Sequence, residues 1–199
     1  MLPAIGFWFL RHGETDWNAQ GLSQGAADVP LNANGEAQAR RAAELLKGAG
    51  IATIVASPLQ RARRTAETAA ARLDLPVSFD PELREVAFAG REGQRLGSWF
   101  EDWVAGTATP EGAESFAALA SRARRAVSRA LVLPSPVLIV SHGALFRALR
   151  AVMGLPVAVR TPNAIPIFCD PPPAATPEGP WSLRAPGSLS LIGDPKISG

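Results

Sequence analysis

The two histidines of this 199-residue chain occupy matched positions, because each ends an apolar run and each is followed by glycine. His12 follows the run Phe7–Arg11, and His142 follows the run Val137–Ser141. A neutral imidazole can act as a nucleophile or as a proton carrier. Both runs are typical of buried strands, and ligands of open α/β sheets bind beyond the carboxyl ends of the strands. The sequence therefore predicts that both rings line one pocket.

Arginine is the second residue type that points to chemistry here. Most of the 20 basic residues are arginine, whose planar fork matches phosphate and carboxylate. Ser57-Pro58 predicts a helix start with Ser57 as the N-cap, which puts Arg61 in the first turn, where the helix favours anions. Two histidines without carboxylates at helical spacing are a poor metal site, and Glu14 and Asp16 are simply polar loop residues. We therefore expect an anion site with no metal.

The elements that must position these residues alternate along the chain. Short apolar runs alternate with longer amphipathic ones, which predicts an α/β fold with a mainly parallel sheet and βα topology throughout. The predicted strands are Ile5–Leu10, Ile51–Ala56, Val77–Phe79 and Val137–Val140. The predicted helices run from an N-cap at Asn32 to Leu46 with Gly48 as the stop, and over Pro58–Leu73, Ser115–Leu133 and Ala144–Met153.

Composition limits the classes of protein that remain. The chain is 47% hydrophobic, enough for one core, and its net charge of +2 gives no reason to expect nucleic acid or a membrane as partner. The apolar start ends at Arg11 and has no basic segment before it, so we expect neither a secretory signal nor a membrane span. One cysteine, Cys169, excludes an internal disulfide and fits a reducing, cytoplasmic location.

The last forty residues differ from the rest. Half of the 18 prolines follow Arg160, including Pro171-Pro172-Pro173, and proline excludes regular helix there. We expect a single domain over residues 1–199, with a core at 1–160 and an irregular, proline-rich peripheral segment at 161–199. Two runs in that segment, Ala164–Cys169 and Trp181–Arg184, are candidates for an edge hairpin.

Three motifs together resemble the histidine phosphatase superfamily, also called the phosphoglycerate mutase-like family. They are Arg11-His12-Gly13-Glu14-Thr15 ahead of Asn18, the segment from Ser57-Pro58-Leu59-Gln60-Arg61 to Ala66, and Ser141-His142-Gly143. The likeness covers Phe7 to Leu155, and the set is specific because the motifs come in the family's order on the expected elements. It implies a three-layer αβα sandwich with a mainly parallel sheet, and chemistry without a metal or cofactor.

The resemblance also implies a role for each motif residue. His12 is the nucleophile that forms a phosphohistidine, and Arg11 and Arg61 cradle the phosphoryl oxygens while disfavouring a proton on His12. His142 donates a hydrogen bond to the transferring group. Asn18 and Gln24 match positions that contact phosphate in family members.

Glu85 matches the proton donor of the family. A carboxyl group beside a bound phosphate holds its proton more tightly because like charges repel, which suits it to protonate the leaving alkoxide and then to activate water. The loop that follows departs from the family pattern, since Ala89 stands beside its glycine and Arg91 stands where relatives often have an aromatic residue. Leu22 occupies a place where many relatives have arginine.

Several nearby residues have simpler interpretations. Arg63 and Arg64 are expected on a solvated helix face. Ser57, Thr15 and Thr65 are interpreted as caps or packing residues rather than nucleophiles. Trp99 and Trp103 lie four residues apart on one helical face. The sequence leaves two roles for them, packing in the core and covering the substrate as a lid.

The predicted function is hydrolysis of a small phosphate monoester by an enzyme of histidine acid phosphatase type. A cofactor-dependent phosphoglycerate mutase is the alternative within the family, but mutases carry an insertion between the acidic motif and the second histidine that the segment between Glu85 and His142 is too short to hold. A phospho-ligand-binding regulatory protein of low activity is a third interpretation, which the altered loop at Arg91 would permit. No residue selects the ester, and the oligomeric state is open.

Overall fold

The computed structural model of the chain describes residues 1–186, which form a six-stranded sheet flanked by helices. The strands are β1 (Phe7–Arg11), β2 (Thr53–Ala56), β3 (Val77–Phe79), β4 (Val137–Ser141), β5 (Pro166–Asp170) and β6 (Ser182–Arg184). Their order is β3-β2-β4-β1-β5-β6. The pairs from β3 to β1 are parallel, whereas β5 runs antiparallel to both β1 and β6. The predicted α/β class with a mainly parallel sheet is confirmed, although the βα pattern does not extend to β5 and β6.

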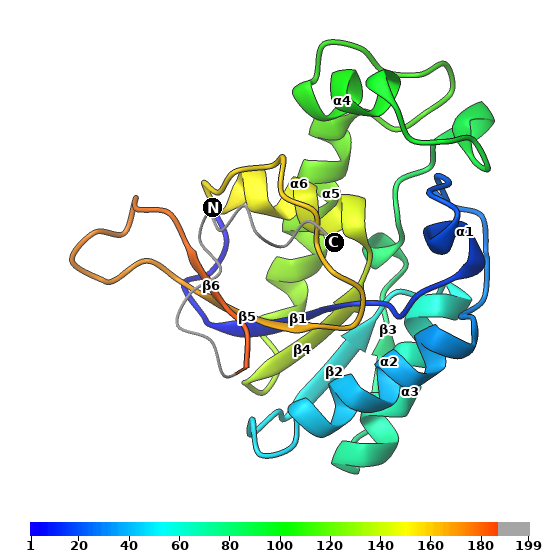
Figure 1. Ribbon diagram of the computed structural model, residues 1–199. Coiled ribbons are helices and arrows are strands. Elements are labelled where there is room, and N and C mark those ends of the chain that lie inside the picture. Colours follow the sequence, from blue (N-terminus) through cyan, green and yellow to red (C-terminus); the bar gives the residue numbers. More distant parts are fainter. Residues whose placement is uncertain (187–199) are drawn as a thin grey trace.

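Helices cover both faces of the sheet, as Figure 1 shows. The helices α2 (Ala33–Leu45) and α3 (Gln60–Leu73) pack together on one face, and α5 (Phe116–Ala130) and α6 (Gly143–Val152) pack together on the other. Because side chains alternate along a strand, β4 supplies both cores. Leu138 and Val140 join the core under α2 and α3, while Val137 and Ile139 join the core under α5 and α6.

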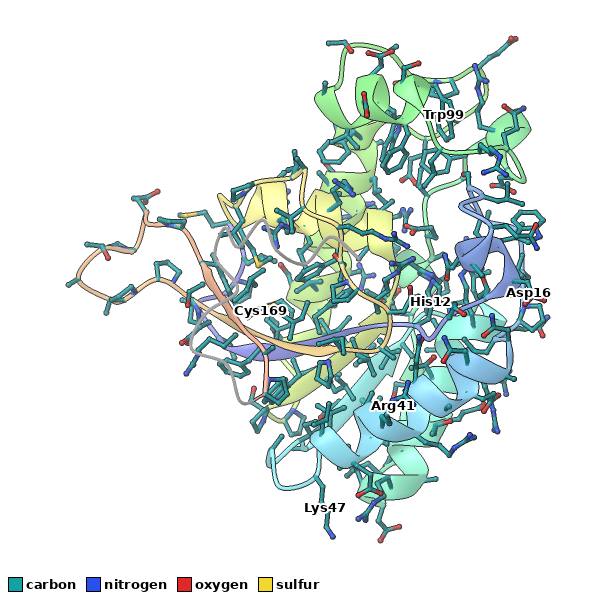
Figure 2. The ribbon with its side chains drawn as sticks, viewed as in Figure 1. His12, Asp16, Arg41, Lys47, Trp99 and Cys169 are labelled. Carbon is teal, nitrogen blue, oxygen red and sulfur yellow. The ribbon has the colours of Figure 1, made fainter. Side chains whose placement is uncertain are left out.

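A long excursion separates β3 from α5. It contains the 3-10 turns η1 (Pro81–Leu83) and η2 (Ala89–Arg91) and the helix α4 (Ser98–Ala105), which packs against α5 beyond the end of the sheet. A short helix, α1 (Asp16–Ala19), follows β1. Figure 2 shows Trp99 in the α4 region, well away from the sheet edge where His12 lies.

The helix that carries Arg61 begins later than the sequence predicts. Helix α3 starts at Gln60 and not at Pro58, and Ser57 is not its N-cap. The backbone N–H of Gln60 donates to the Asp28 carboxylate at 2.7 Å, so a residue distant in sequence caps the helix. This start leaves the Ser57 hydroxyl free for other partners. Asn32 does cap α2, since its side chain accepts from the N–H of Gly35.

The proline-rich segment contributes two strands. The runs expected to form an edge hairpin overlap β5 and β6, which pair antiparallel, and β5 also pairs with β1 inside the sheet. Residues 187–199, the end of the segment expected to be irregular, lie outside the described residues. Within the described part, no helix combines the length and the apolar character needed to span a bilayer.

Candidate active site

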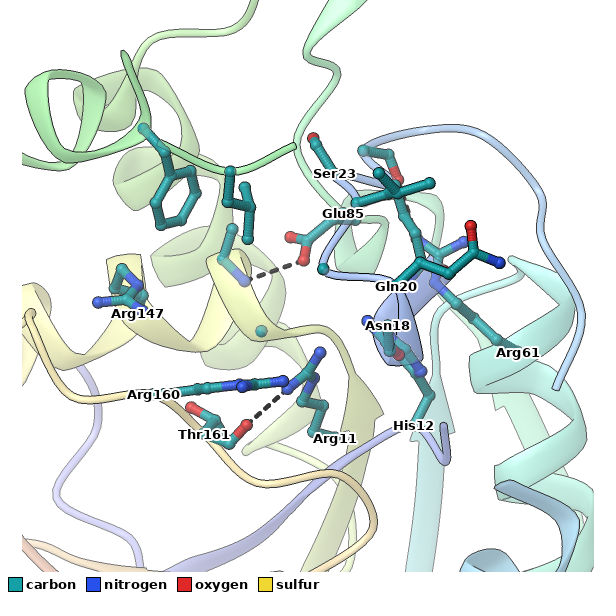
Figure 3. Close-up of a pocket in the computed structure, with 18 of the residues that line it drawn as sticks. Arg11, His12, Asn18, Gln20, Ser23, Arg61, Glu85, Arg147, Arg160 and Thr161 are labelled. Carbon is teal, nitrogen blue, oxygen red and sulfur yellow. Dashed lines mark hydrogen bonds between the residues drawn. The ribbon is translucent and has the colours of Figure 1, made fainter. Parts of the chain in front are cut away.

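A pocket opens at the carboxyl ends of β1 and β4, the edge of the sheet at which the sequence places both histidines. Its volume is about 590 Å³. Figure 3 shows side chains entering it from the loop after β1, from α1, from α3, from the Glu85 segment, from α6 and from the loop before β5. The lining residues include the predicted site residues Arg11, His12, Asn18, Gln24, Arg61 and Glu85. His142, which the sequence also predicts to line the pocket, is fully buried behind His12 and is not one of the lining residues.

His12 directly follows β1 and is only 2% exposed. Its backbone N–H continues the strand pairing by donating to the carbonyl of Ser141 at 3.0 Å. The ring Nδ1 lies 2.7 Å from the carbonyl oxygen of Gly13. Because a carbonyl only accepts hydrogen bonds, Nδ1 carries the ring proton, and Nε2 keeps its lone pair. A ring held in this tautomer is prepared for nucleophilic attack.

His142 lies fully buried beside His12, with the ring centroids 5.2 Å apart. Its Nε2 is 2.7 Å from the hydroxyl of Ser57, which follows β2. That hydroxyl also accepts from the N–H of Leu59 at 3.3 Å, and it has one proton to donate. With the Ser57 hydroxyl as the donor to Nε2, the proton of His142 lies on Nδ1, a buried atom with no hydrogen-bond partner in the described part of the chain.

Arg11 and Arg61 bring two guanidinium groups to the same hollow. Arg11 donates through NH1 to the carbonyl of Thr161 at 2.7 Å. Arg61 donates to the carbonyls of Ala27 and Gly25 at 2.7 and 2.8 Å, which ties α3 to the loop after α1. The Nε atom of each arginine is buried without a partner among the residues described. An unsatisfied buried donor costs about 1–3 kcal/mol, so these atoms are poised for an anion.

The electrostatics of the pocket keep both imidazoles neutral. Burial, and then the charges of Arg61 and Arg11, hold the pKa of His12 well below its usual value of 6.5. Burial and the same charges lower the pKa of His142. Burial also lowers the pKa of Arg11 and of Arg61 to about 10, so both guanidinium groups remain charged at neutral pH.

Asn18 and Gln24 both line the pocket, and their amides are held differently. The side-chain oxygen of Asn18 accepts from the N–H of Thr15 at 3.3 Å and from the side chain of Asn163 at 3.2 Å, which directs the NH₂ group of Asn18 as the donor toward a ligand. Asn163 also donates to the carbonyl of His12 at 2.9 Å. Gln24 is buried, and its Oε1 has no partner within residues 1–186.

Glu85 sits against the N-terminus of α6. One carboxylate oxygen accepts from the N–H of Ala144, and the other accepts from the N–H groups of Leu145 and Val86, at 2.9–3.1 Å. The backbone of this segment is held by Arg122, which donates to the carbonyls of Glu82 and Arg84 at 2.7 Å. These bonds fix the position of Glu85, the one carboxylate among residues 1–186 that lines the pocket.

The glycines after the two histidines allow close approach. A Cβ atom at Gly13 would lie 2.4 Å from the carbonyl oxygen of Gly35 in α2, and a Cβ at Gly143 would lie 3.2 Å from Nε of Arg11. The matched His-Gly pattern therefore has two different causes. Gly13 lets α2 pack on the loop after β1, and Gly143 leaves room for a guanidinium group.

Neither tryptophan of α4 lines the pocket. Trp103 is fully buried, donates to the carbonyl of Glu114 at 2.8 Å and contacts Phe88, and Trp99 packs edge-on against Phe88. The guanidinium of Arg91 lies 5.6 Å from the Trp99 ring. Core packing is thus the role of Trp103, and Phe100 on the same helix, with Leu96 just before it, supplies the apolar wall of the pocket.

The structure adds pocket residues that the sequence analysis did not identify. They include Ser23, Arg95, Arg147, Arg160 and Thr161. Ser57 also belongs to the site through its contact with His142, and Thr65 does so by accepting from the N–H of Gly13 at 3.1 Å. The sequence could have placed Arg147 near the site, because it lies on the predicted helix five residues after His142. Arg160 lies in a proline-rich loop without periodicity, and nothing in the sequence places it.

The described part of the chain matches one protein family over most of its length. The model of the histidine phosphatase superfamily (branch 1) matches residues 7–164. A protein named "Probable phosphoglycerate mutase GpmB" from Serratia proteamaculans is 42% identical over 162 residues, which cover 75% of each chain.

Solved structures agree with this match. A mycobacterial glucosyl-3-phosphoglycerate phosphatase complexed with VO3 superposes with a TM-score of 0.78 at 30% identity, covering 89% of this chain and 96% of that one. The protein TTHB049 from Thermus thermophilus superposes with a TM-score of 0.71 at 34% identity, covering 84% and 95% of the two chains.

Proposed function

The chain belongs to the histidine phosphatase superfamily, and from this premise we propose that it hydrolyses small phosphate monoesters through a phosphohistidine, without a metal. The observation that carries the proposal is the set of unpaired buried nitrogens around His12. Nε of Arg11, Nε of Arg61 and Nδ1 of His142 come from three separate segments, and none has an acceptor in the described structure. A phosphoryl group offers three acceptor oxygens, which suits these donors.

In the first step, Nε2 of His12 attacks phosphorus, the N–P bond forms and the P–O ester bond breaks. The carbonyl of Gly13 holds the proton on Nδ1 and stabilises the positive charge that the ring acquires. The two guanidinium groups and Nδ1–H of His142 stabilise the oxygens of the transferring group, where negative charge is concentrated in the transition state.

Glu85 is proposed to supply the proton that the leaving alkoxide needs. In the second step water attacks phosphorus, Glu85 takes the proton of that water, and the N–P bond breaks to release inorganic phosphate and free His12. Splitting one difficult displacement into two easier ones is the advantage of the covalent route. The bonds from α6 hold the carboxyl group in place for both transfers.

A mutase is the second candidate, since curated relatives bear that name. It would return the phosphoryl group of His12 to an acid instead of to water. The pocket is open enough to be lined by exposed residues such as Arg95 and Leu96, so water has access to it, which favours hydrolysis.

The test is a panel of phosphate monoesters assayed with excess chelator. Wild type is expected to release inorganic phosphate, and His12→Ala should lose at least about a thousandfold of the rate, since a residual rate from binding alone remains in comparable knockouts. Brief incubation with ³²P-labelled ester followed by alkaline quench should trap an acid-labile phosphoprotein in wild type alone. Transfer to an acceptor acid without free phosphate would favour the mutase, and ligand binding without turnover would favour a regulatory role.

A further inference from the structure

The loop that leads into β5 is fastened to the end of β1 on both sides of Asn163. The carbonyl of Thr161 accepts from NH1 of Arg11 at 2.7 Å, a bond that Figure 3 shows as a dashed line. The N–H of Ala164 donates to the carbonyl of Arg11 at 3.0 Å. Ala164 is buried and has a φ of 48°, a left-handed conformation that a residue with a Cβ atom keeps only where its surroundings hold it. Asn163 is therefore held in one place against the end of β1.

The two hydrogen bonds of Asn163 determine which way its amide points. Its Nδ2 lies 2.9 Å from the carbonyl oxygen of His12 and 3.2 Å from Oδ1 of Asn18. Because a backbone carbonyl only accepts, the group of Asn163 that faces it must be NH₂, and the second hydrogen of that group is left for Asn18. The carbonyl of His12 thus sets the direction of the Asn163 amide.

The amide of Asn18 takes its direction from Asn163 in turn. Its Oδ1 accepts from the N–H of Thr15 at 3.3 Å, and the NH₂ group of Asn163 is a second donor to the same atom. Turning the amide over would place its NH₂ group against two donors and lose both bonds. The observed direction leaves the NH₂ group of Asn18 for the pocket, where Figure 3 also shows His12. The oxygens of an ionised phosphoryl group only accept, so this direction is the one that can bind them.

We propose that Asn163 is a positioning residue for the phosphoryl site, which acts by keeping the NH₂ group of Asn18 directed at the phosphoryl oxygens. The inference rests on the proposed function and adds a residue from the segment that the sequence predicts to be peripheral. Asn163 does not itself line the pocket, so its effect on a ligand is indirect. Without it, the N–H of Thr15 is the one donor found for Oδ1 of Asn18 within residues 1–186.

The experiment first replaces the NH₂ group of Asn163 by an oxygen. In Asn163→Asp the carboxylate repels Oδ1 of Asn18, so that amide should turn over and present its oxygen to the phosphoryl site. The dissociation constant of inorganic phosphate, measured by calorimetry, should rise about tenfold or more, because a hydrogen bond to a charged group is lost. Asn163→Ala removes the donor without adding charge and should raise this constant about fivefold, since Thr15 alone still favours the native direction.

Steady-state kinetics with p-nitrophenyl phosphate give a second measurement. The NH₂ group of Asn18 contacts the phosphoryl group in the ground state and in the transition state alike. KM should therefore rise in Asn163→Ala by about the factor seen in calorimetry, while kcat stays within about threefold. A fall in kcat with KM unchanged would contradict the proposed role.

A double-mutant cycle with Asn18→Ala separates this role from a merely structural one. Where residue 18 has no amide, Asn163→Ala should change the phosphate affinity by less than about twofold. Equal losses in the two backgrounds would show that Asn163 acts on the loop and not on Asn18, and they would overturn the proposal, as would unchanged affinity in Asn163→Asp. Thermal melts show which variants fold, and the cycle uses Asn163→Ala, so it decides even if the aspartate variant does not fold.

Asn34→Asp is the matched control for the added charge. Asn34 is an exposed asparagine on α2 that donates to the Glu14 carboxylate and does not line the pocket. The same substitution there should leave the phosphate affinity within about twofold, because solvent and salt screen an exposed charge. A loss equal to that in Asn163→Asp would assign the effect to negative charge alone and reject the positioning role.

Calorimetry with inorganic phosphate also separates failure of this inference from failure of the proposed function, because it needs no turnover. If no ester is hydrolysed but the cycle shows the expected coupling, Asn163 positions Asn18 in a protein that only binds phosphate. If esters are hydrolysed and phosphate affinity does not depend on Asn163, the hydrolase stands and the positioning role is rejected.

Discussion

Two residues of the same type acquire different properties here from their hydrogen-bond partners. The carbonyl of Gly13 holds the ring proton of His12 on Nδ1. With the Ser57 hydroxyl donating to Nε2, the ring proton of His142 also lies on Nδ1, but the two rings then offer different atoms to a ligand. In His12 the protonated nitrogen is occupied, and the bare Nε2 can attack. In His142 the protonated nitrogen has no partner among the described residues and can donate. From one short contact per ring we therefore infer which imidazole attacks and which donates.

Ser57→Ala tests this assignment. Without the hydroxyl, Nε2 of His142 loses its buried partner and the ring is no longer held in one tautomer, so kcat should fall about tenfold. KM for a small ester should change less than kcat, because the donor acts on the transferring group. Steady-state kinetics of Ser57→Ala and Ser57→Thr measure the effect.

Ser57→Thr keeps the hydroxyl and is expected to recover most of the rate. A thermal melt of both variants controls for folding. An unchanged kcat in Ser57→Ala, or an equal loss in both variants, would show that the hydroxyl does not orient His142.

Among the site residues, the sequence identifies those that belong to a motif at the end of a predicted strand or at the start of a predicted helix. His12, Arg11, Arg61 and His142 fall on element ends that periodicity reveals, and the structure brings them together. The sequence predicts Ser57 as a cap, whereas its partner in the structure, His142, lies 85 residues away, and no local pattern indicates such a contact. Gln24 lies in a loop without periodicity, so the sequence places it at the site through the family resemblance alone, and the structure shows it lining the pocket.

Among the elements, the contact between the loop after β1 and α2 is especially close. A Cβ at Gly35 would lie 2.0 Å from the carbonyl oxygen of Glu14, in addition to the approach of Gly13 to Gly35. Backbone touches backbone here, so neither side can yield by turning a side chain. The helix therefore sets the position of His12 through its neighbours in the chain.

Gly13→Ala should displace this loop. Overlap with backbone atoms is expected to cost roughly 1–3 kcal/mol of stability and to lower kcat by an order of magnitude or more. Gly90→Ala is the control, because nothing lies within 4 Å of a Cβ at that position. Urea denaturation and kinetics of both variants provide the comparison. If Gly13→Ala behaves like Gly90→Ala, the close packing has no functional role.

Arg122 joins helix α5 to the Glu85 segment. It forms a two-bonded ion pair with Glu114 at 2.6–2.9 Å and donates to the carbonyls of Glu82 and Arg84. Arg122→Ala should cost roughly 2–4 kcal/mol in stability and lower kcat, because Glu85 loses its support. Arg125→Ala breaks an exposed ion pair with Glu82 and should cost under about 1 kcal/mol.

The readout that separates support of Glu85 from general stability is the leaving group. A p-nitrophenyl ester needs little protonation, so Arg122→Ala should hydrolyse it nearly as well as wild type does while losing rate on an alkyl ester. Equal losses on the two esters would mean that Arg122 stabilises the fold only.

The sequence also predicts most elements of the parallel sheet, since each combines an apolar run with a helix that has a recognisable stop. It places the start of α3 two residues early, because Asp28 caps that helix from another loop. It does not anticipate that β5 enters the sheet between β1 and β6, since the order in which strands pair leaves no periodic signal. The altered loop at Arg91 departs from the family pattern, and its arginine stacks on Trp99.

For the molecule as a whole, two buried neutral imidazoles make stability depend on pH. The pKa of each is lower in the folded state than the 6.5 of an unfolded chain. Below pH 6.5 the unfolded chain therefore binds more protons, and the free energy of unfolding should fall as pH falls. The slope can reach about 1.4 kcal/mol per pH unit for each histidine.

Urea denaturation between pH 7.5 and 5 measures this slope, a range that lies above the usual pKa of carboxylates. His12→Gln removes one of the two contributions and should reduce the slope by about half. Because the chain has two histidines, NMR of their ring protons can follow both. A ring titrating near 6.5 in the folded protein would contradict the prediction.

The later part of the excursion between β3 and α5 separates the apolar wall of the pocket from the groups proposed to react. Most groups proposed to handle phosphorus sit on the sheet edge, on α1 and α3, and at the start of α6, and Glu85 lies in the first part of the excursion, against α6. Leu96 and Phe100 belong to the later part, which packs outside the sheet. Residues 89–113 can therefore change during evolution, and with them the preferred ester, while the groups proposed to react with phosphorus stay the same. Replacing residues 89–113 with the corresponding segment of a relative should therefore change the preferred ester and leave the proposed reacting groups in place.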